Sequence, residues 1–277
     1  MSRSYLFIPG DVPNMLQNLD VFDADTIIID FEDAVSINDK LEARMLTHAF
    51  LTQYTFDKPA IYIRINDVDT DYFNDDIKTI KHLPIDGIVL PKVSKDALKT
   101  METQYKKYTI TFPIIGIIET PNAFFELEAI VSHPLIEGVL LGGEDLTKAL
   151  GIERTKQGTE ILFARSQLVM AAKSYDKVVI DTPYTDVKNL DDLAPDCHLA
   201  RSLGFTGKAA IHPNHVDTIN AQFSPTLKAI EHAKRIVHMH KKTGSMRFSL
   251  DGKMIDKPVI ERAKDTLKRA QYYGVIR

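Results

Sequence analysis

The chain lacks several residues and patterns that would point to particular classes of protein. Its 277 residues include one cysteine, Cys197, and no tryptophan. A lone cysteine excludes an internal disulfide, so we interpret Cys197 as a core or surface residue and not a nucleophile, and we predict a cytoplasmic protein. No apolar run has the length of a membrane span and the first residues carry no export signature, so we expect neither membrane insertion nor export.

A strong excess of one charge is also missing. The chain has 34 Lys and Arg against 38 Asp and Glu, a net charge of -4, and no basic run stands out. Nucleic acid is therefore not an expected partner. No G-x-G-x-x-G or Walker pattern follows an apolar run, which weakens the case for an open nucleotide-binding sheet. No Cys/His cluster suggests zinc, and no Ser-His-Asp arrangement is recognisable.

What the sequence does contain is a series of short apolar runs that alternate with helical patterns. The runs are rich in β-branched residues and lack polar alternation, which is typical of parallel strands buried on both faces. We predict eight strands within residues 1–223, at 5–8, 26–33, 60–66, 87–92, 113–119, 138–144, 177–181 and 207–211. Eight strand–helix units predict an α/β fold, a (β/α)8 TIM barrel, whose active site lies at the C-terminal ends of the strands.

Residues 224–277 form a predicted C-terminal helical extension. Ser224 is the expected N-cap of its first helix and Gly244 the expected residue after its last turn. A turn at 248–256 precedes a second helix at 258–273. Because a closed barrel does not need this helix pair, we expect it to pack on the barrel or on a neighbouring subunit.

Two apolar runs end in carboxylates that could bind a metal ion. Glu119 ends the run 113–119, and Asp145 follows the run 138–144. Neighbouring parallel strands lie about 4.8 Å apart, so two carboxylates at one rim of the sheet could share a cation. Hard oxygen ligands favour Mg²⁺, with Mn²⁺ as the alternative. The competing interpretation is that each acid complements the dipole of the helix that follows it.

Other polar residues at the predicted strand ends complete the candidate site. Arg64 is interpreted either as a clamp for a carboxylate or oxyanion, or as an internal ion pair with Glu32 or Asp33. These two acids either bind the metal through water or begin the next helix. Lys92 either neutralises the acidic mouth or is solvated, and Asp251 by itself indicates an Asp-Gly turn. The remaining strand-end groups are Asp30, Asn66, Glu144, Asp181 and His212.

Nine short motifs then occur in an order that resembles one family. The motifs lie at 6–10 (LFIPG), 29–35 (IDFEDAV), 63–66 (IRIN), 90–92 (LPK), 118–121 (IETP), 141–147 (LGGEDLT), 162–165 (LFAR), 207–213 (GKAAIHP) and 251–256 (DGKMID). With them the chain is similar to the citrate lyase β-subunit and its relatives, the malyl-CoA and citramalyl-CoA lyases of the HpcH/HpaI aldolase group. The resemblance covers nearly the whole chain.

The resemblance implies a TIM barrel that assembles into homotrimers and a Mg²⁺-dependent carbon–carbon lyase. The implied substrate is a 3-hydroxyacyl thioester, such as citryl-ACP or citryl-CoA, which is cleaved to oxaloacetate and an acetyl thioester. Glu119 and Asp145 match the metal ligands, and Arg64 matches the substrate-binding arginine, with Glu119 and Lys92 beside the substrate. Asp251 resembles the catalytic aspartate that reaches a neighbouring subunit's site.

One segment departs from the pattern of the CoA-using relatives. They commonly carry basic residues after the Pro-Gly of the first strand, whereas residues 11–18 here contain none. Citrate lyase β-subunits also tend to lack them, because their substrate is attached to a carrier protein. This difference favours the citrate lyase interpretation, with citrate lyase α and γ subunits as possible partners. The alternatives are a malyl-CoA or citramalyl-CoA lyase and a non-catalytic assembly subunit, which would neither bind metal nor cleave thioesters.

Overall fold

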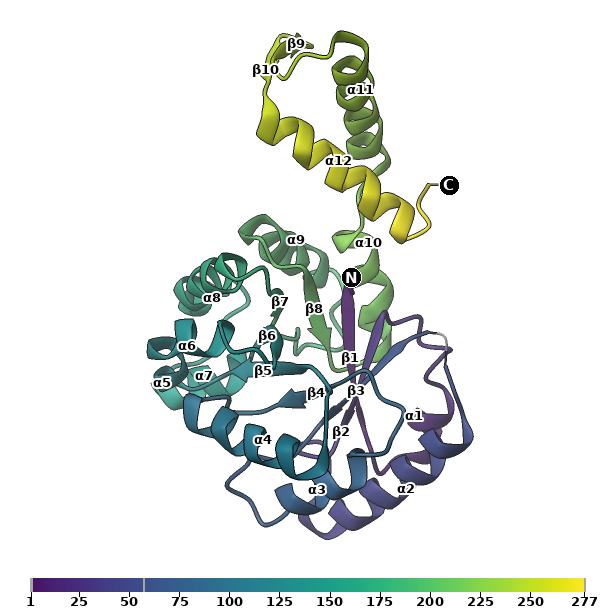
Figure 1. Ribbon diagram of the computed structural model, residues 1–277, viewed down its shortest axis with the longest axis vertical. Coiled ribbons are helices and arrows are strands. Elements are labelled where there is room, and N and C mark those ends of the chain that lie inside the picture. Colours follow the sequence, from purple (N-terminus) through teal and green to yellow (C-terminus); the bar gives the residue numbers. More distant parts are fainter. Residues whose placement is uncertain (1, 57, 277) are drawn as a thin grey trace. The chain divides into compact units, whose positions relative to one another are not determined.

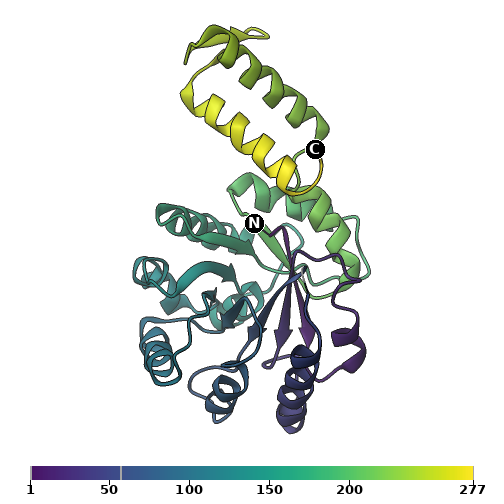
Figure 2. The same cartoon turned by 45° about the vertical axis from the view of Figure 1, so that its right-hand side comes forward.

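The barrel predicted from the sequence is present in the computed structural model, which describes residues 2–56 and 58–276. Eight parallel strands pair in chain order, and the first also pairs with the last, so the barrel closes. Figures 1 and 2 show the strands at the centre with helices around them. The strands are β1 (Ser4–Pro9), β2 (Thr26–Asp30), β3 (Ala60–Arg64), β4 (Gly87–Leu90), β5 (Ile114–Ile118), β6 (Ile136–Leu141), β7 (Val178–Asp181) and β8 (Gly207–Ala210).

The helices of this unit lie between the strands, as the alternating pattern predicts. Two of them are irregular: the helical segment after β5 is divided at Glu126, and a short 3₁₀ turn at Thr159–Ile161 precedes α8. Among the described residues, no helix has the length and apolar character needed to cross a membrane. The helices are α1 (Pro13–Gln17), α2 (Lys40–Gln53), α3 (Phe73–Ile80), α4 (Lys95–Tyr108), α5 (Pro121–Phe125), α6 (Leu127–Val131), α7 (Gly143–Leu150), α8 (Leu162–Ser174), α9 (Leu193–Leu203) and α10 (Val216–Phe223).

Strand alternation decides which side chains reach the barrel interior. The interior core consists of alternate strand residues, namely Tyr5, Ile28, Tyr62, Val89, Ile115, Ile117, Leu140, Ile180 and Ala209. Successive strand residues point to opposite faces, so Arg64 and Glu119 follow interior residues by two positions and share their side. Asp181 directly follows Ile180 and therefore faces the surrounding helices. The alternation along each strand thus separates residues that face the barrel interior at its mouth from residues that face the helices in the barrel wall.

The chain divides into two compact units, residues 1–220 and 221–277. The sequence places this boundary slightly later, between residues 223 and 224, where α10 ends. The second unit contains α11 (Leu227–Thr243), β9 (Phe248–Leu250), β10 (Lys253–Ile255) and α12 (Lys257–Tyr272). Its own core consists of Ala233, Ile236, Ile255, Ile260 and Ala263.

The caps of α11 only partly match the prediction. Ser224 is not the N-cap, because the helix begins at Leu227 and the Thr226 hydroxyl accepts a hydrogen bond from the Ala229 amide. A side-chain oxygen one position before the helix satisfies one of its free amides, which Ser224 is too far upstream to do. Gly244 ends the helix in the left-handed conformation, with φ of 63°, as the sequence predicts.

Cys197 lies buried on α9 as a free thiol. Burial raises its pKa to about 12. Because the thiolate is the reactive form of cysteine, this side chain is suited to packing and not to nucleophilic attack.

Candidate active site

Arg64 is held in a fixed orientation by residues on two neighbouring strands. Asp30 lies opposite it in the β2–β3 register and binds it through two hydrogen bonds. The distances are 2.7 Å from Nε to Oδ1 and 2.5 Å from Nη2 to Oδ2. The Phe7 ring of β1 packs against the guanidinium, 5.1 Å from its carbon to the ring centre. One edge and one face of Arg64 are therefore fixed before any substrate arrives.

The remaining edge of Arg64 contacts two more acids. Its Nη1 lies 2.8 Å from Glu32 and 3.5 Å from Asp33. The internal ion pair, one of the two sequence interpretations of Arg64, is therefore present, and it includes Asp30, which the sequence analysis did not assign as a partner. A substrate carboxylate would reach Arg64 by replacing Glu32 or Asp33 at Nη1.

The segment that carries these acids is anchored through its backbone. Asp30 accepts hydrogen bonds from the amides of Glu32 and Ala34, at 2.8 and 3.0 Å. The Lys40 ammonium donates to the carbonyl oxygens of Phe31 and Glu32, both at 2.7 Å. Burial raises the pKa of the Glu32 carboxyl to about 7, although the Arg64 charge opposes this rise. The acids of the β2–α2 segment are thus rigidly placed at the barrel mouth.

Glu119 follows β5 directly and is almost fully buried, with 4% of its surface exposed. The Lys92 amide donates to its Oε1 at 2.6 Å, and Lys92 adopts a left-handed backbone with φ of 44° to do so. Burial, together with the nearby charges of Glu32 and Asp145, raises the pKa of Glu119 to about 8, although the hydrogen bond from the Lys92 amide opposes this rise. The Lys92 ammonium contacts Asp67, at 3.1 Å. A buried carboxylate among other acids is stabilised in its ionised form by a cation.

Asp145 is not at the end of a strand as the sequence suggests. β6 ends at Leu141, and two glycines lead the chain directly into α7, so Asp145 lies in the first turn of that helix. The helix-dipole interpretation is therefore geometrically possible for Asp145. Glu119 instead precedes Thr120, the N-cap of α5, and binds the Lys92 amide. The Asp145 charge contributes to the raised pKa of Glu119, so the two carboxyl groups are close enough to interact electrostatically.

The donor set at this mouth fits a magnesium ion that is bound by few protein ligands. Within residues 2–56 and 58–276, no group of three or more His, Cys, Asp or Glu side chains is arranged to hold a metal. Glu119 and Asp145 would supply two hard oxygen ligands, and substrate and water would supply the others, as is usual for Mg²⁺. Gly142 leaves space beside this site, because a Cβ there would lie 2.7 Å from Oε2 of Glu119.

Gly142→Ala is expected to displace Glu119 and weaken Mg²⁺ binding at the mouth roughly tenfold to a hundredfold, the range found when the support of a metal ligand is lost. The added Cβ would lie 2.5 Å from the Glu119 Cβ, so the side chain must shift. A Mg²⁺ titration followed by calorimetry would test this. Gly151→Ala is the control, since its Cβ meets nothing within 4 Å and it costs only the left-handed backbone energy, about 1–2 kcal/mol. Unchanged magnesium binding in Gly142→Ala would contradict the assignment.

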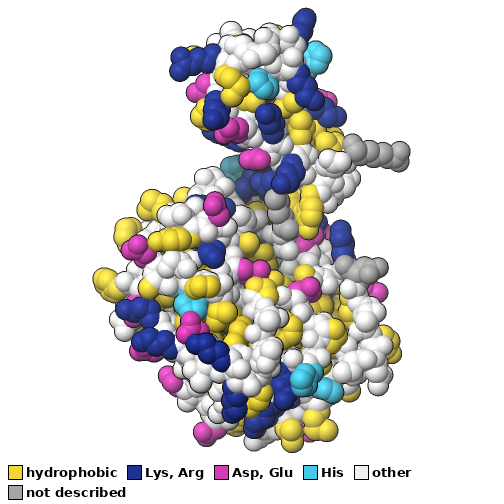
Figure 3. Space-filling model, viewed as in Figure 1, with side chains coloured by type: hydrophobic (Ala, Val, Ile, Leu, Met, Phe, Trp, Pro, Cys, Tyr) yellow, Lys and Arg dark blue, Asp and Glu magenta, His cyan; other side chains and the backbone are white. Residues whose placement is uncertain are grey.

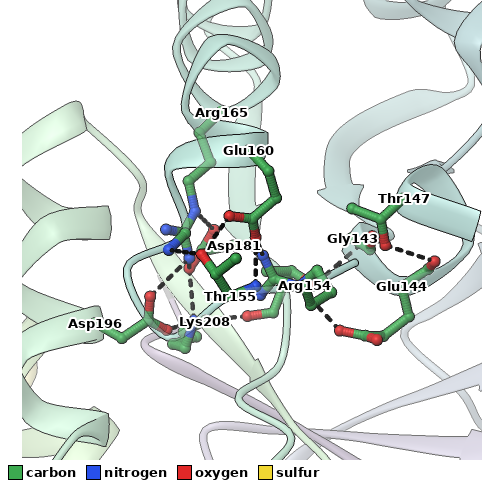
Figure 4. Close-up of polar contacts among 12 residues, drawn as sticks. Gly143, Glu144, Thr147, Arg154, Thr155, Glu160, Arg165, Asp181, Asp196 and Lys208 are labelled. Atoms are coloured by element: carbon green, nitrogen blue, oxygen red, sulfur yellow. Dashed lines mark hydrogen bonds and ion pairs between the residues drawn. The ribbon is translucent and has the colours of Figure 1, made fainter. Parts of the chain in front are cut away.

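Asp181, another strand-end acid, belongs to a buried ionic network in the barrel wall (Figure 4). Arg165 of α8 donates to both oxygens of Asp181, at 2.8 and 2.9 Å, and Lys208 of β8 lies 2.6 Å from Oδ2. Asp196 of α9 contacts both cations. The network balances two positive and two negative charges, so it is a structural feature of the wall. The sequence analysis missed it, although a buried arginine and lysine always require partners.

Glu144 precedes Asp145 in the chain, but its side chain does not interact with the candidate metal ligands. Its side chain is half exposed and contacts Arg154 at 3.0 Å. Arg154 also contacts Glu160, at 2.9 Å, and Figure 4 shows these three side chains in a row. Glu144 therefore ties the loop after α7 to the start of α8.

Asp251 lies in the C-terminal unit, at the tip of the β9–β10 hairpin. Leu250 pairs with Lys253, so Asp251 and Gly252 form a two-residue turn with φ of 54° and 75°. Two left-handed residues are typical of a type I′ turn, for which Asp-Gly is well suited. The Arg235 side chain of α11 donates to Asp251 at 2.5 Å and lowers the pKa of its carboxyl. The turn predicted from the sequence is present, and it presents an ionised carboxylate.

The fold and the mouth together define a class of protein. A closed parallel barrel that gathers buried acids and an arginine beyond its strand ends has the architecture of a TIM-barrel enzyme, since catalytic groups of this fold lie there. The model of the family described as HpcH/HpaI aldolase/citrate lyase matches residues 3–213. The chain belongs to this family.

Individual relatives match the chain over nearly its full length. Citrate lyase subunit beta of Haemophilus influenzae is 32% identical over 284 residues, covering 98% of this chain and 97% of that protein. The (3S)-malyl-CoA thioesterase of Cereibacter sphaeroides is 29% identical, covering 99% and 96%. The structure of the protein CitE of Mycobacterium tuberculosis in complex with magnesium, acetoacetate and coenzyme A has a TM-score of 0.83 at 23% identity and covers 98% of both chains. This last similarity supports the fold.

Proposed function

We propose that the chain is a Mg²⁺-dependent carbon–carbon lyase of the citrate lyase β-subunit type. It would cleave a citryl thioester, on a carrier protein or on coenzyme A, to oxaloacetate and an acetyl thioester. The observation that carries the proposal is the buried Glu119 carboxylate at the barrel mouth, which the Lys92 amide holds in place among other acids. The citrate lyase relatives and the magnesium in the CitE complex support the same chemistry.

Some residues of the barrel mouth would bind the cation, and others would bind the substrate. Glu119 and Asp145 would hold Mg²⁺, and the Lys92 amide orients Glu119 by its hydrogen bond. When bound, Mg²⁺ would supply Lewis-acid polarisation of the substrate hydroxyl and carboxylate. Glu32 and Asp33 contact Nη1 of Arg64 and would support the site through water. Lys92 would add positive charge beside the substrate once it leaves Asp67.

Arg64 and Asp251 would act on the reacting atoms. As the bond between the carbinol carbon and the methylene breaks, the hydroxyl proton passes to a carboxylate of the mouth and a ketone forms. The bonding electrons pass to the thioester half as an enolate, whose oxygen Arg64 would stabilise. Asp251 would then deliver a proton to the enolate carbon, which completes the acetyl thioester. Because Arg235 lowers the pKa of Asp251 and keeps it ionised, this role requires that their ion pair opens and that Asp251 takes up a proton from solvent before it protonates the enolate carbon.

The assembly is part of the proposal. The extension, residues 224–277, would pack on a neighbouring subunit in a homotrimer, so that Asp251 serves the neighbour's site. Citrate lyase α and γ subunits would be further partners, and a cytoplasmic location fits the buried free Cys197.

Cleavage of citryl, malyl and citramalyl thioesters, each with Mg²⁺ and with a chelator, tests the proposal. We expect oxaloacetate to form from the citryl thioester at a rate that falls at least about a hundredfold on chelation. Faster cleavage of malyl-CoA would support the alternative suggested by the malyl-CoA thioesterase relative. If no thioester is cleaved and Mg²⁺ does not bind, the lyase proposal is wrong and a non-catalytic subunit is favoured.

A further inference from the structure

The two units of the chain carry opposite charge. Residues 221–277 contain 13 Lys and Arg against 5 Asp and Glu, whereas residues 1–220 contain 21 against 33. The modest net charge of the whole chain therefore hides a basic C-terminal unit. In Figure 3, dark blue side chains gather on this unit. A local excess of this size attracts an anionic partner.

Part of this charge forms one face of α11. Lys234, His238, Lys241 and Lys242 follow a spacing of four, three and one residues, which places them on one side of a helix, with Arg235 beside them. All five side chains are exposed. The opposite side of the helix is buried through Ile230, Ala233 and Ile236. We call these five residues the basic face.

The charges of the basic face are largely uncompensated within the chain. Of its lysines and arginine, Arg235 alone has an acidic partner among the described residues, namely Asp251. Lys241 and Lys242 lie in the last turn, where they complement the helix dipole. Lys234, Arg235 and His238 lie further from that end, so the dipole does not account for them.

The size and position of the basic face indicate what binds there. From Lys234 to Lys242 the helix rises about 12 Å, which is long for a single carboxylate and suits an extended acidic surface. Arg235 joins the basic face to Asp251, the proposed proton donor. A partner bound along α11 would therefore bring its attached group close to Asp251.

The segment after the first strand offers no comparable positive charge that could bind the phosphates of a nucleotide. The segment 11–18 begins with Asp11 and contains no basic residue. Resting on the proposed function, we infer that the basic face binds an acidic face of the carrier protein that presents the acyl thioester. Charge complementarity, the unpaired lysines and the contact with Asp251 support this partner over coenzyme A.

The test compares three citryl thioesters: one on a purified acyl carrier protein, one on coenzyme A, and one on N-acetylcysteamine, which has neither protein nor phosphate. The variant K234Q/K241Q/K242Q neutralises the basic face but leaves Arg235 and Asp251 intact. The control K228Q/K264Q/K268Q removes the same charge from exposed positions of α11 and α12.

We expect the KM for the carrier-borne substrate to rise roughly tenfold in the first variant, since three exposed charge contacts are lost. Its kcat, and kcat/KM for the N-acetylcysteamine thioester, should stay within about twofold, and raising the salt concentration should remove the difference between the variant and the native chain. The control should resemble the native chain with every substrate.

Several results would overturn the inference. An equal loss with all three thioesters would show a structural effect, and no loss with any would show that the face is only solvated. A loss confined to coenzyme A would assign the face to nucleotide phosphates, and dissociation of an oligomer would assign it to contacts between copies. If the native chain cleaves no thioester, the proposed function fails separately, and carrier binding measured by calorimetry still decides: tenfold weaker binding by the variant supports the face, and unchanged binding refutes it.

Discussion

Asp145→Asn is expected to lower the rate of thioester cleavage by about 10³-fold while the barrel stays folded. The substitution keeps the size of the side chain but removes the charge that, with Glu119, would hold Mg²⁺. Polarisation by a bound metal contributes several kcal/mol, and each 1.36 kcal/mol corresponds to a factor of about ten in rate. Single-turnover rates and Mg²⁺ binding by calorimetry would measure both effects, and circular dichroism would follow the fold.

Glu144→Gln provides a matched control for this prediction. Both acids lie in the first turn of α7, so each substitution removes the same interaction with the helix dipole, about 0.3–1 kcal/mol. Glu144 is half exposed, and its partner Arg154 keeps its contact with Glu160. We expect its activity to stay within about twofold of the native chain, as for most surface substitutions. Equal losses in the two variants would show that Asp145 acts through its helix and not through a metal.

The barrel could be predicted from the sequence because its signal is local. Each strand is a short β-branched run, and the order of eight such runs with helices between them leaves few alternative folds. α3 has a weaker local signal because it is short: Phe73, Ile77 and Ile80 are its buried apolar residues, and polar residues separate them. The N-cap of α11 was misplaced because Ser224 and Thr226 are both good caps, and only the observed start of the helix distinguishes them.

The site was predictable only in part, because contacts across strands decide its geometry. The alternation of the strands points Arg64 and Glu119 toward the interior, but the sequence cannot show that Asp30 binds Arg64 through both oxygens. That pairing depends on the register between β2 and β3. Likewise, Asp181 ends a strand as a site residue would. Because it directly follows the interior residue Ile180, its side chain points outward to Arg165 and Lys208 in the barrel wall.

Asp251→Asn is expected to lower turnover by about 10²–10⁴-fold, the range for loss of a general acid. Asn-Gly supports the same type I′ turn as Asp-Gly, so the β9–β10 hairpin should keep its conformation. The variant therefore removes the proton donor and leaves the turn, which separates the two interpretations of Asp251. Asp256→Asn is the control, because asparagine is an equally good N-cap and the carboxylate of Asp256 caps α12 in the same unit. Full activity in Asp251→Asn would leave Asp251 as a turn residue.

Mixing two inactive variants shows which subunit Asp251 serves. If it acts on a neighbouring barrel, oligomers assembled from equal amounts of Asp145→Asn and Asp251→Asn contain sites built from one intact barrel and one intact hairpin. Random assembly through a head-to-tail ring makes about a quarter of the sites complete, so about a quarter of the native activity should return after denaturation and joint refolding. If Asp251 acts within its own chain, every site lacks one residue and no activity returns. The two arrangements therefore give results that differ far beyond the error of a rate measurement, since each variant alone is expected to be at least a hundredfold slower.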